Sequence, residues 1–192
     1  FKRCFSDITA WSPDVVILID YPGFNFRVAE WAHNKGYKVY YYIAPKVWAS
    51  REGRIKKLKA YVDKLFIVFP FEIPYFTRKG IDFIYKGNPL VDAIDNSAAL
   101  KETREEFLTR NGLKDKPMIA LMAGSRTGEI SSMMPVFMQF ADKMRELAQY
   151  ADYQFVVAAA PSRSMSDYAQ YLKGREAYVN VVFGESYAVI RH

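Results

Sequence analysis

Residues 13–43 read PDVVILIDYPGFNFRVAEWAHNKGYKVYYYI, in which two short apolar runs flank a longer mixed segment. The runs Val15–Ile19 and Lys38–Ile43 are rich in β-branched and aromatic side chains, which favour strands. The segment Phe26–Asn34 between them has the apolar spacing of a helix that packs on one side. Strand, helix and strand in this order predict a βαβ unit with parallel strands.

The same alternation continues along the rest of the chain. Further strands are expected at Lys64–Phe69, Phe83–Tyr85, Met118–Met122, Tyr153–Ala158 and Tyr178–Phe183. Helices are expected at Glu52–Val62, Glu72–Lys79, Leu100–Asn111, Ser132–Tyr150, Ser166–Lys173 and from Ser186 onward, with left-handed C-caps at Gly36, Gly80 and Gly112. Most strands are continuously apolar, which predicts that both faces of the sheets are covered. The predicted fold class is α/β with parallel sheets.

The stretch Pro89–Leu100 is the expected boundary between two half-sized α/β units. It contains the polar run 95–97 and leads into a charged helix, after which the alternation restarts. We therefore predict one domain at residues 1–95 and a second at 96–192. The chain begins without Met and stops where another strand is due, so we expect it to be a piece of a longer protein.

The composition excludes several classes of protein. Of 192 residues, 51% are hydrophobic and 25% charged, with a net charge of +6, so the chain is neither disordered nor collagen-like. One Cys and two His allow no disulfide framework and no Cys/His zinc cluster. No apolar run approaches the length that spans a bilayer.

Two loops that follow predicted strands carry candidate functional residues, because ligands of open parallel sheets bind where the strands end. Asp20 follows the first strand, where it can act as a general base, although Asp20 or Asn25 can instead cap the next helix. Trp48 lies in the aromatic and basic loop Ala44–Arg51, where it can stack on a ring or enter a lipid headgroup layer. The alternative for this loop is a packed Trp followed by a solvated helix face.

A third loop, residues 123–129, reads AGSRTGE between an apolar strand and a long helix. Small residues and a helix amino terminus favour a phosphate, and Arg126 adds a bidentate donor for a diphosphate. The loop is neither a Walker A sequence nor a Gly-x-Gly-x-x-Gly fingerprint. The alternative is a tight turn in which Glu129 favours the helix amino terminus. Arg163, after the next strand, is a further cation without a specific signature.

Taken in order, several segments of the chain resemble one family. They are residues 13–16 and 20–25, 42–49, 69–72, 87–92 and 124–129. This series is similar to the lipid-A-disaccharide synthases, the inverting glycosyltransferases of lipopolysaccharide assembly. The chain departs from the pattern at Gly23, Ser50, Asn88 and Ala123, where many members have Asp, Trp, His and Pro.

The resemblance implies a GT-B architecture with two Rossmann-like domains, of which this chain holds the end of the first and the start of the second. The implied reaction joins UDP-2,3-diacylglucosamine to 2,3-diacylglucosamine 1-phosphate, giving the disaccharide 1-phosphate and UDP with no metal ion and no cofactor. Residues 1–95 would lie on the acceptor side and residues 96–192 on the nucleotide-sugar side. Because the family's first and last motifs are absent here, we expect these residues alone to be inactive.

The resemblance also assigns roles to single residues. Asp20 matches the essential aspartate, a base for the acceptor 6-hydroxyl, and Arg126 matches the arginine of the Gly-Ser-Arg motif that suits the diphosphate. Substrate and nucleotide contacts are expected from the residues around them, which are Asn25, Trp48, Asn88, Gly124, Ser125 and Glu129.

The acylated substrates imply a cytoplasmic enzyme at the inner face of the inner membrane, with the basic segment Lys46–Lys59 facing anionic lipid. Nucleic acid is not an expected partner, and a homodimer is left open. One alternative is another GT-B enzyme that uses a UDP-sugar, such as an epimerase or a transferase with a soluble acceptor. The other is a noncatalytic module that holds nucleic acid or an anionic membrane through the basic helix.

Overall fold

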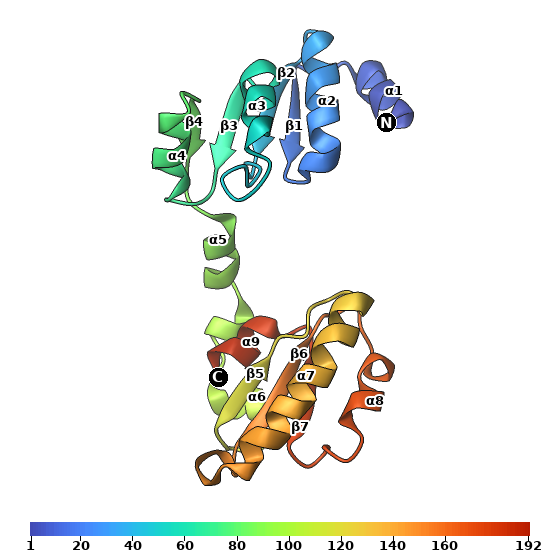
Figure 1. Cartoon of the computed structure of the whole chain (residues 1–192), viewed down its shortest axis with the longest axis vertical. Helices are drawn as coiled ribbons and strands as arrows, with labels where there is room; N and C mark the ends of the chain where they lie inside the picture. The colour runs from blue at the N-terminus through green and yellow to red at the C-terminus, as the bar shows by residue number, and fades with distance from the viewer. The chain divides into compact units, whose positions relative to one another are not determined.

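A computed structural model describes residues 1–192 as two compact units, Phe1–Asp92 and Ala93–His192. Each unit is built around its own parallel sheet (Figure 1). The fold class predicted from the sequence is therefore confirmed. Helix α5 (Pro89–Asp95) spans the junction, inside the stretch that the sequence predicts as a boundary.

The first unit carries a four-stranded sheet in the order β1-β2-β3-β4. These strands span Val15–Ile19, Lys38–Tyr42, Lys64–Ile67 and Phe83–Tyr85. The helices are α1 (Lys2–Trp11), α2 (Pro22–Asn34), the 3₁₀ turn η1 (Glu52–Arg54), α3 (Ile55–Tyr61) and α4 (Glu72–Arg78). Register pairs such as Val16 with Val39 and Tyr41 with Leu65 bring buried side chains to one face of the sheet.

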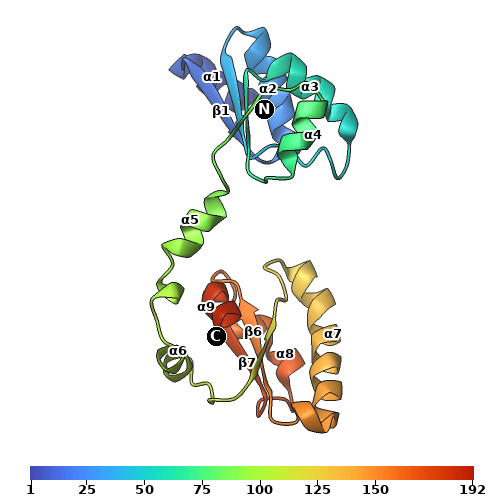
Figure 2. The same ribbon diagram turned by 90° about the vertical axis from the view of Figure 1, so that its left-hand side faces the viewer.

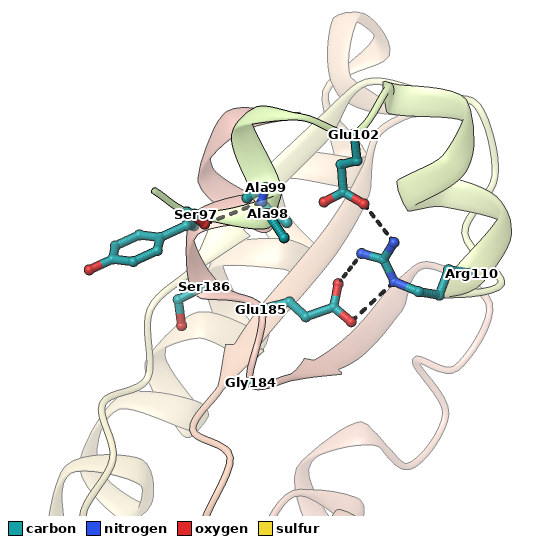
Figure 3. A pocket seen from close by; sticks show the side chains of 10 residues that line it. Ser97, Ala98, Ala99, Glu102, Arg110, Gly184, Glu185 and Ser186 are labelled. Carbon is teal, nitrogen blue, oxygen red and sulfur yellow. Dashed lines mark hydrogen bonds and ion pairs between the residues drawn. The ribbon is translucent and has the colours of Figure 1, made fainter. Parts of the chain in front are cut away.

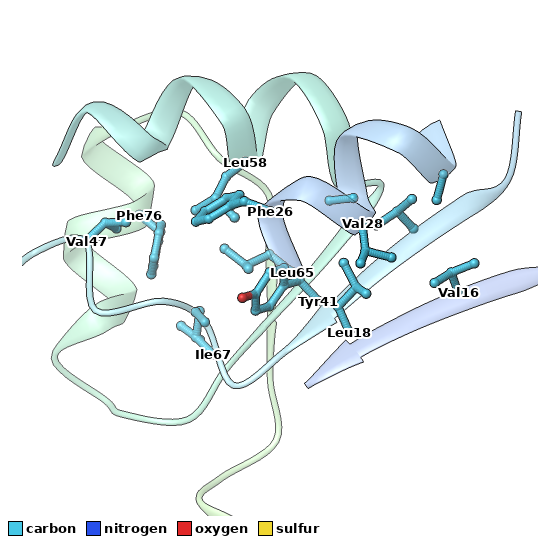
Figure 4. Close-up of a cluster of buried hydrophobic side chains, with 14 residues drawn as sticks. Val16, Leu18, Phe26, Val28, Tyr41, Val47, Leu58, Leu65, Ile67 and Phe76 are labelled. Atoms are coloured by element: carbon cyan, nitrogen blue, oxygen red, sulfur yellow. The ribbon is translucent and has the colours of Figure 1, made fainter. Parts of the chain in front are cut away.

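The core of the first unit lies between that face and helices α2, α3 and α4 (Figures 2 and 4). Its buried side chains include Val16, Leu18, Val39, Tyr41, Leu65 and Ile67 from the strands and Phe26, Val28, Leu58 and Phe76 from the helices. On the other face, Ile17 and Ile19 are 61% and 58% exposed. The prediction that both faces are covered is therefore wrong for this sheet, because these three helices all pack on the same side.

The second unit carries the sheet β5-β6-β7, with strands at Met118–Leu121, Gln154–Ala159 and Val179–Phe183. Its helical segments are η2 (Ala98–Leu100), α6 (Arg104–Arg110), α7 (Thr127–Glu146), η3 (Ala148–Tyr150), η4 (Met165–Asp167), α8 (Ala169–Leu172) and α9 (Ser186–Arg191). Every residue of β6 is buried, because α7 and α8 cover one face of the sheet and α6 and α9 the other (Figure 2). Here the prediction of two covered faces is confirmed.

Several helix boundaries differ from the predicted ones. Helix α2 begins at Pro22 rather than Phe26, since proline fits the first turn of a helix. Helix α6 begins only at Arg104, because Thr103 and Glu106 form a capping box. Helix α1 was not predicted at all. The φ angles at Gly36, Gly80 and Gly112 are 85°, 60° and 62°, which confirms the three predicted C-caps.

Candidate functional site

Two consecutive residues after β1 adopt the left-handed backbone conformation, which is unusual for residues other than glycine. The φ angles of Asp20 and Tyr21 are 44° and 40°. The Asp20 N–H donates to the Tyr42 carbonyl at 3.0 Å, and the Asp20 carbonyl accepts from the Tyr41 hydroxyl and the Asn25 amide, each at 2.7 Å. Neighbouring elements thus hold a strained turn in place, as is common at functional sites.

The Asp20 side chain itself is exposed, and no hydrogen bond or ion pair within the chain engages its carboxylate. Burial raises the pKa of the Tyr41 hydroxyl, and the charge of Asp20 raises it further. Tyr41 therefore stays protonated at physiological pH and keeps donating to the Asp20 carbonyl. The backbone of Asp20 is fixed while its carboxylate stays available.

Asn25 lies behind this turn. Because α2 already begins at Pro22, Asn25 sits in its first turn, only 8% exposed, and donates to the carbonyls of Ile19 and Asp20. The helix has no side-chain cap, so the alternative that Asp20 or Asn25 caps it is wrong. A substrate contact from Asn25 stays a prediction, and its observed contacts support the Asp20 turn.

A pocket of about 550 Å³ lies in the first unit where its strands end. It brings the predicted residues Asp20 and Asn88 together, because parallel strands end at one edge of a sheet. The full lining is Asp20, Pro22, Ile43, Ala44, Lys46, Ser50, Arg54, Val68, Phe69, Asn88, Pro89 and Leu90. Sequence reasoning counted Lys46 within a basic segment and did not connect either Lys46 or Arg54 with Asp20.

Trp48 does not line this pocket. Its indole N–H donates to Glu72 Oε1 at 3.1 Å, and its ring packs edge-on against Phe71 with 4.9 Å between centroids. Glu72 is only 1% exposed, and its Oε2 also accepts from the N–H groups of Val68 (3.2 Å) and Phe69 (3.0 Å). The sequence treats residues 69–72 as an ordinary strand exit, so this buried carboxylate was missed. The feature of the sequence that could have indicated it is an acidic residue in the first turn of the predicted helix.

In the loop at residues 124–129 of the second unit, a glutamate again accepts hydrogen bonds from backbone N–H groups, as Glu72 does in the first unit. The N–H groups of Ser125 and Arg126 donate to Glu129 Oε2 at 2.9 and 3.0 Å, while Arg126 Nη1 lies 2.7 Å from Glu129 Oε1. These hydrogen bonds hold the pKa of Glu129 below its ordinary value. Glu129 therefore has the role given in the alternative interpretation, in which it closes a tight turn at the amino terminus of α7. A substrate contact from Glu129 stays a prediction. The Arg126 side chain is 83% exposed and available to a ligand.

Arg163 ties this loop to the loop after β6. Its Nε donates to the Ser125 carbonyl at 2.7 Å, and its Nη1 donates to Thr127 Oγ1 at 3.1 Å. From the sequence, Arg163 is only a cation without a specific signature. In the structure, Arg163 holds the Gly-Ser-Arg segment through hydrogen bonds from the neighbouring loop after β6.

Gly124 is the position in this loop that tolerates a side chain least. Its φ is 83°, and a Cβ atom there would lie 2.5 Å from Glu129 Oε2 and 2.8 Å from Glu129 Cβ. We expect Gly124→Ala to lower the free energy of unfolding of the second unit by about 1–3 kcal/mol, through backbone strain and lost loop hydrogen bonds. Amide hydrogen exchange of β5 to β7 measures this change.

The matched control is Gly128→Ala. Gly128 lies in the first turn of α7, and nothing lies within 4 Å of a Cβ added there. Its replacement should be neutral or slightly stabilising, since alanine favours helices. Equal exchange rates in the two variants would contradict the role assigned to Gly124.

A second pocket, of about 680 Å³, lies within the second unit and contains none of the predicted site residues (Figure 3). Arg110 forms ion pairs there with Glu102 and Glu185, each at 2.6 Å, and Asn111 donates to Glu185 at 3.2 Å. The charged side chains that line this pocket therefore pair with one another, and these contacts connect the loop after β7 to α6.

The Glu185 contacts predict a pH dependence of stability. Hydrogen bonds from Arg110 hold the pKa of Glu185 below its ordinary value of 4.5. Because the folded-state pKa is the lower one, this stabilisation is complete above the unfolded-state pKa and is lost as pH falls through the folded-state pKa. We expect Glu185→Gln to lower the stability of the second unit at neutral pH and to flatten its loss below about pH 4.5. Denaturation followed by hydrogen exchange between pH 7 and pH 3 measures both effects.

Glu146→Gln, at the exposed end of α7, is the control for this series. It should leave the acid dependence as steep as in the unmodified chain. An equally steep curve in Glu185→Gln would contradict the assignment.

No group of three or more His, Cys, Asp or Glu side chains is placed to hold a metal ion. No helix has both the length and the apolar character needed to cross a membrane.

Comparison with known proteins identifies the chain's relatives. A model of the lipid-A-disaccharide synthetase family matches residues 1–190. The lipid-A-disaccharide synthase of Geobacter metallireducens is 39% identical over 185 residues, covering 96% of this chain and 47% of that protein. The enzyme of the same name from Coxiella burnetii (strain Dugway 5J108-111) is 38% identical over 160 residues, covering 83% of this chain and 41% of that protein. The chain thus spans about half the length of the curated relatives it matches.

Solved structures share the fold. The Staphylococcus aureus MnaA–UDP co-structure superposes with a TM-score of 0.65 at 14% identity, covering 99% of this chain and 53% of that one. UDP-GlcNAc 2-epimerase from Neisseria meningitidis bound to UDP-GlcNAc gives 0.61 at 15% identity, covering 98% and 54%. These likenesses agree with the expected GT-B type of fold. The family match and the sequence identities confirm the resemblance seen in the motifs, and the chain belongs to the lipid-A-disaccharide synthetase family.

Proposed function

We propose that the full-length protein transfers the diacylglucosamine of UDP-2,3-diacylglucosamine to the 6-hydroxyl of 2,3-diacylglucosamine 1-phosphate. The observation that carries this proposal is the family match over residues 1–190, joined to the unengaged Asp20 carboxylate in the pocket of the first unit. In this proposal the first unit serves the acceptor and the second serves the nucleotide sugar.

In the proposed reaction, the first unit supplies a proton acceptor and the second unit stabilises the leaving group. Asp20 accepts the proton of the acceptor 6-hydroxyl as its oxygen attacks the anomeric carbon of the donor with inversion. The bond from that carbon to the UDP oxygen breaks, and UDP leaves with the electron pair. Arg126, exposed at the Gly-Ser-Arg loop, stabilises the charge that develops on the departing diphosphate. The step needs no redox partner.

The decisive experiment measures UDP release by the full-length protein with both acylated sugars and with each alone. The proposal requires release only when both are present, with the disaccharide 1-phosphate as product, and none from the 192-residue chain alone. Release or epimerisation with the UDP-sugar alone would favour the epimerase alternative; the solved UDP-GlcNAc 2-epimerase from Neisseria meningitidis shares the fold. Binding without turnover, steeply dependent on salt, would favour the noncatalytic alternative.

We further propose that the enzyme works as a peripheral protein at the cytoplasmic face of the inner membrane. Its acylated substrates reside in a bilayer, and α3 carries Lys56, Lys57 and Lys59. Replacing these three by Glu is expected to weaken binding of the full-length protein to anionic vesicles by about 10-fold or more, since each cation near such a surface contributes about 1 kcal/mol. Co-sedimentation at low salt measures this change.

The control is the same charge reversal at Lys114, Lys173 and Lys143, which lie on the second unit. It changes the net charge equally and should weaken binding less. Equal loss in both triple variants would assign the effect to overall charge and would count against a specific surface on α3.

A further inference from the structure

The pocket that holds Asp20 has an unusual charge pattern. Asp20 shares it with two cations, Lys46 and Arg54. Some basic side chains of the first unit do have acidic partners: Lys57 pairs with Glu30 at 3.2 Å, and Lys79 pairs with Glu52 at 2.5 Å. No acidic side chain pairs with either cation in the pocket. Asp20 also stays unpaired, so opposite charges face one space without neutralising each other.

The local fold explains why these two cations reach the pocket. Lys46 lies in the loop after β2 (Lys38–Tyr42), which leaves the same sheet edge as Asp20. Arg54 ends the 3₁₀ turn η1, which begins after a left-handed residue at Arg51. The Arg54 guanidinium lies 5.6 Å from the centre of the Phe26 ring, a cation–π contact that holds it over the core. Burial raises the pKa of the Tyr41 hydroxyl most, the charge of Asp20 raises it further, and the charge of Arg54 lowers it.

We propose that Lys46 and Arg54 form a subsite for a phosphate monoester on the same sugar whose hydroxyl donates to Asp20. Guanidinium and ammonium groups are the side chains that bind phosphate best, and a carboxylate accepts a hydrogen bond from a sugar hydroxyl. About 550 Å³ is ample for a sugar phosphate. The inference rests on the proposed function, in which the acceptor carries a 1-phosphate and the donor diphosphate meets Arg126 in the other unit.

This arrangement makes the phosphate a specificity element. An acceptor without phosphate leaves two cations unpaired, whereas a phosphate monoester neutralises them and leaves Asp20 to the hydroxyl. The subsite therefore selects a phosphorylated sugar over its neutral analogue before any transfer takes place. It also distinguishes Lys46 and Arg54 from the remaining cations of Lys46–Lys59, which do not line the pocket.

The test is equilibrium binding to the full-length protein without donor, using soluble glucosamine 1-phosphate, glucosamine and inorganic phosphate as separate probes. Lys46→Gln and Arg54→Gln are each expected to weaken glucosamine 1-phosphate binding about 10- to 100-fold and to leave glucosamine binding unchanged. Arg54→Lys should recover part of the loss, and Lys35→Gln, at an exposed cation of the first unit outside the pocket, should have no effect. Asp20→Asn should keep the phosphate affinity while removing transfer.

Several results would overturn the subsite. They are equal affinity of the unmodified protein for both sugars, equal loss of both in the Gln variants, and inorganic phosphate binding as tightly as the sugar phosphate. Because no donor is present, failure of transfer does not affect these outcomes. Conversely, transfer that proceeds equally well with a dephosphorylated acceptor would refute the subsite and leave the proposed function standing.

Discussion

Asp20→Asn in the full-length protein is expected to lower the rate of glycosyl transfer about 10²- to 10⁴-fold while leaving the free energy of unfolding unchanged. An amide has nearly the shape of a carboxylate but cannot accept the proton of the acceptor hydroxyl. The rate loss follows from the proposed role of Asp20. The unchanged stability follows from the structure, where the left-handed turn is held through backbone groups and the carboxylate has no internal partner.

The two halves of this prediction need separate measurements. Transfer is measured as UDP release at saturating concentrations of both sugars, and stability as the denaturant dependence of tryptophan fluorescence. Asp14→Asn is a matched control, because Asp14 is also exposed but precedes β1 and lies at the opposite end of the strand. A variant at Asp20 that keeps more than a tenth of the transfer rate, or that unfolds early, would refute a role as base acting from a preformed turn.

The strands were the most predictable part of the fold. Val15–Ile19 and Phe83–Tyr85 were predicted with the bounds that the structure has, since short apolar runs between turn signals leave little choice. The start of α2 was not, because the Asp20-Tyr21 turn depends on a hydrogen bond from the Tyr41 hydroxyl and on one from the Asp20 N–H to the Tyr42 carbonyl, and both tyrosines are distant in sequence. Periodicity cannot show such contacts.

The candidate site was predictable to the same extent. Asp20 and Asn88 follow different strands, and the topology of a parallel sheet alone brings them to one edge. Which cations of the basic segment join them depends on η1 and on a left-handed Arg51, neither of which the sequence predicts. Likewise the Gly-Ser-Arg motif was visible, but its tether to Arg163 joins two loops through a side chain and needed the structure.

Glu72→Ala is expected to lower the free energy of unfolding of the first unit by about 3–5 kcal/mol. The substitution leaves three donors without their acceptor: the indole N–H of Trp48 and the backbone N–H groups of Val68 and Phe69. Each buried donor left unpaired costs about 1–3 kcal/mol, and water can reach the indole because Trp48 is partly exposed. The loss is therefore smaller than three full penalties but larger than any surface substitution gives.

The chain offers a clean measurement of this loss. All three tryptophans, Trp11, Trp31 and Trp48, lie in the first unit, so tryptophan-selective fluorescence follows the unfolding of that unit alone. Glu30→Ala is the matched control, because Glu30 also accepts from two side chains but in an exposed pair with Lys57, which is worth less than about 1 kcal/mol. Similar losses in both variants would mean that the Glu72 hydrogen bonds contribute no more than a surface pair.

Trp48→Phe divides the Glu72 effect into its parts. It removes the indole donor, keeps an aromatic ring against Phe71, and leaves Glu72 with its two backbone donors. The expected loss is about 1–2 kcal/mol, the range for one hydrogen bond together with slightly poorer packing. If transfer survives this change, Trp48 serves the strand exit beside the pocket; if transfer falls far more than stability, the indole also contacts a substrate.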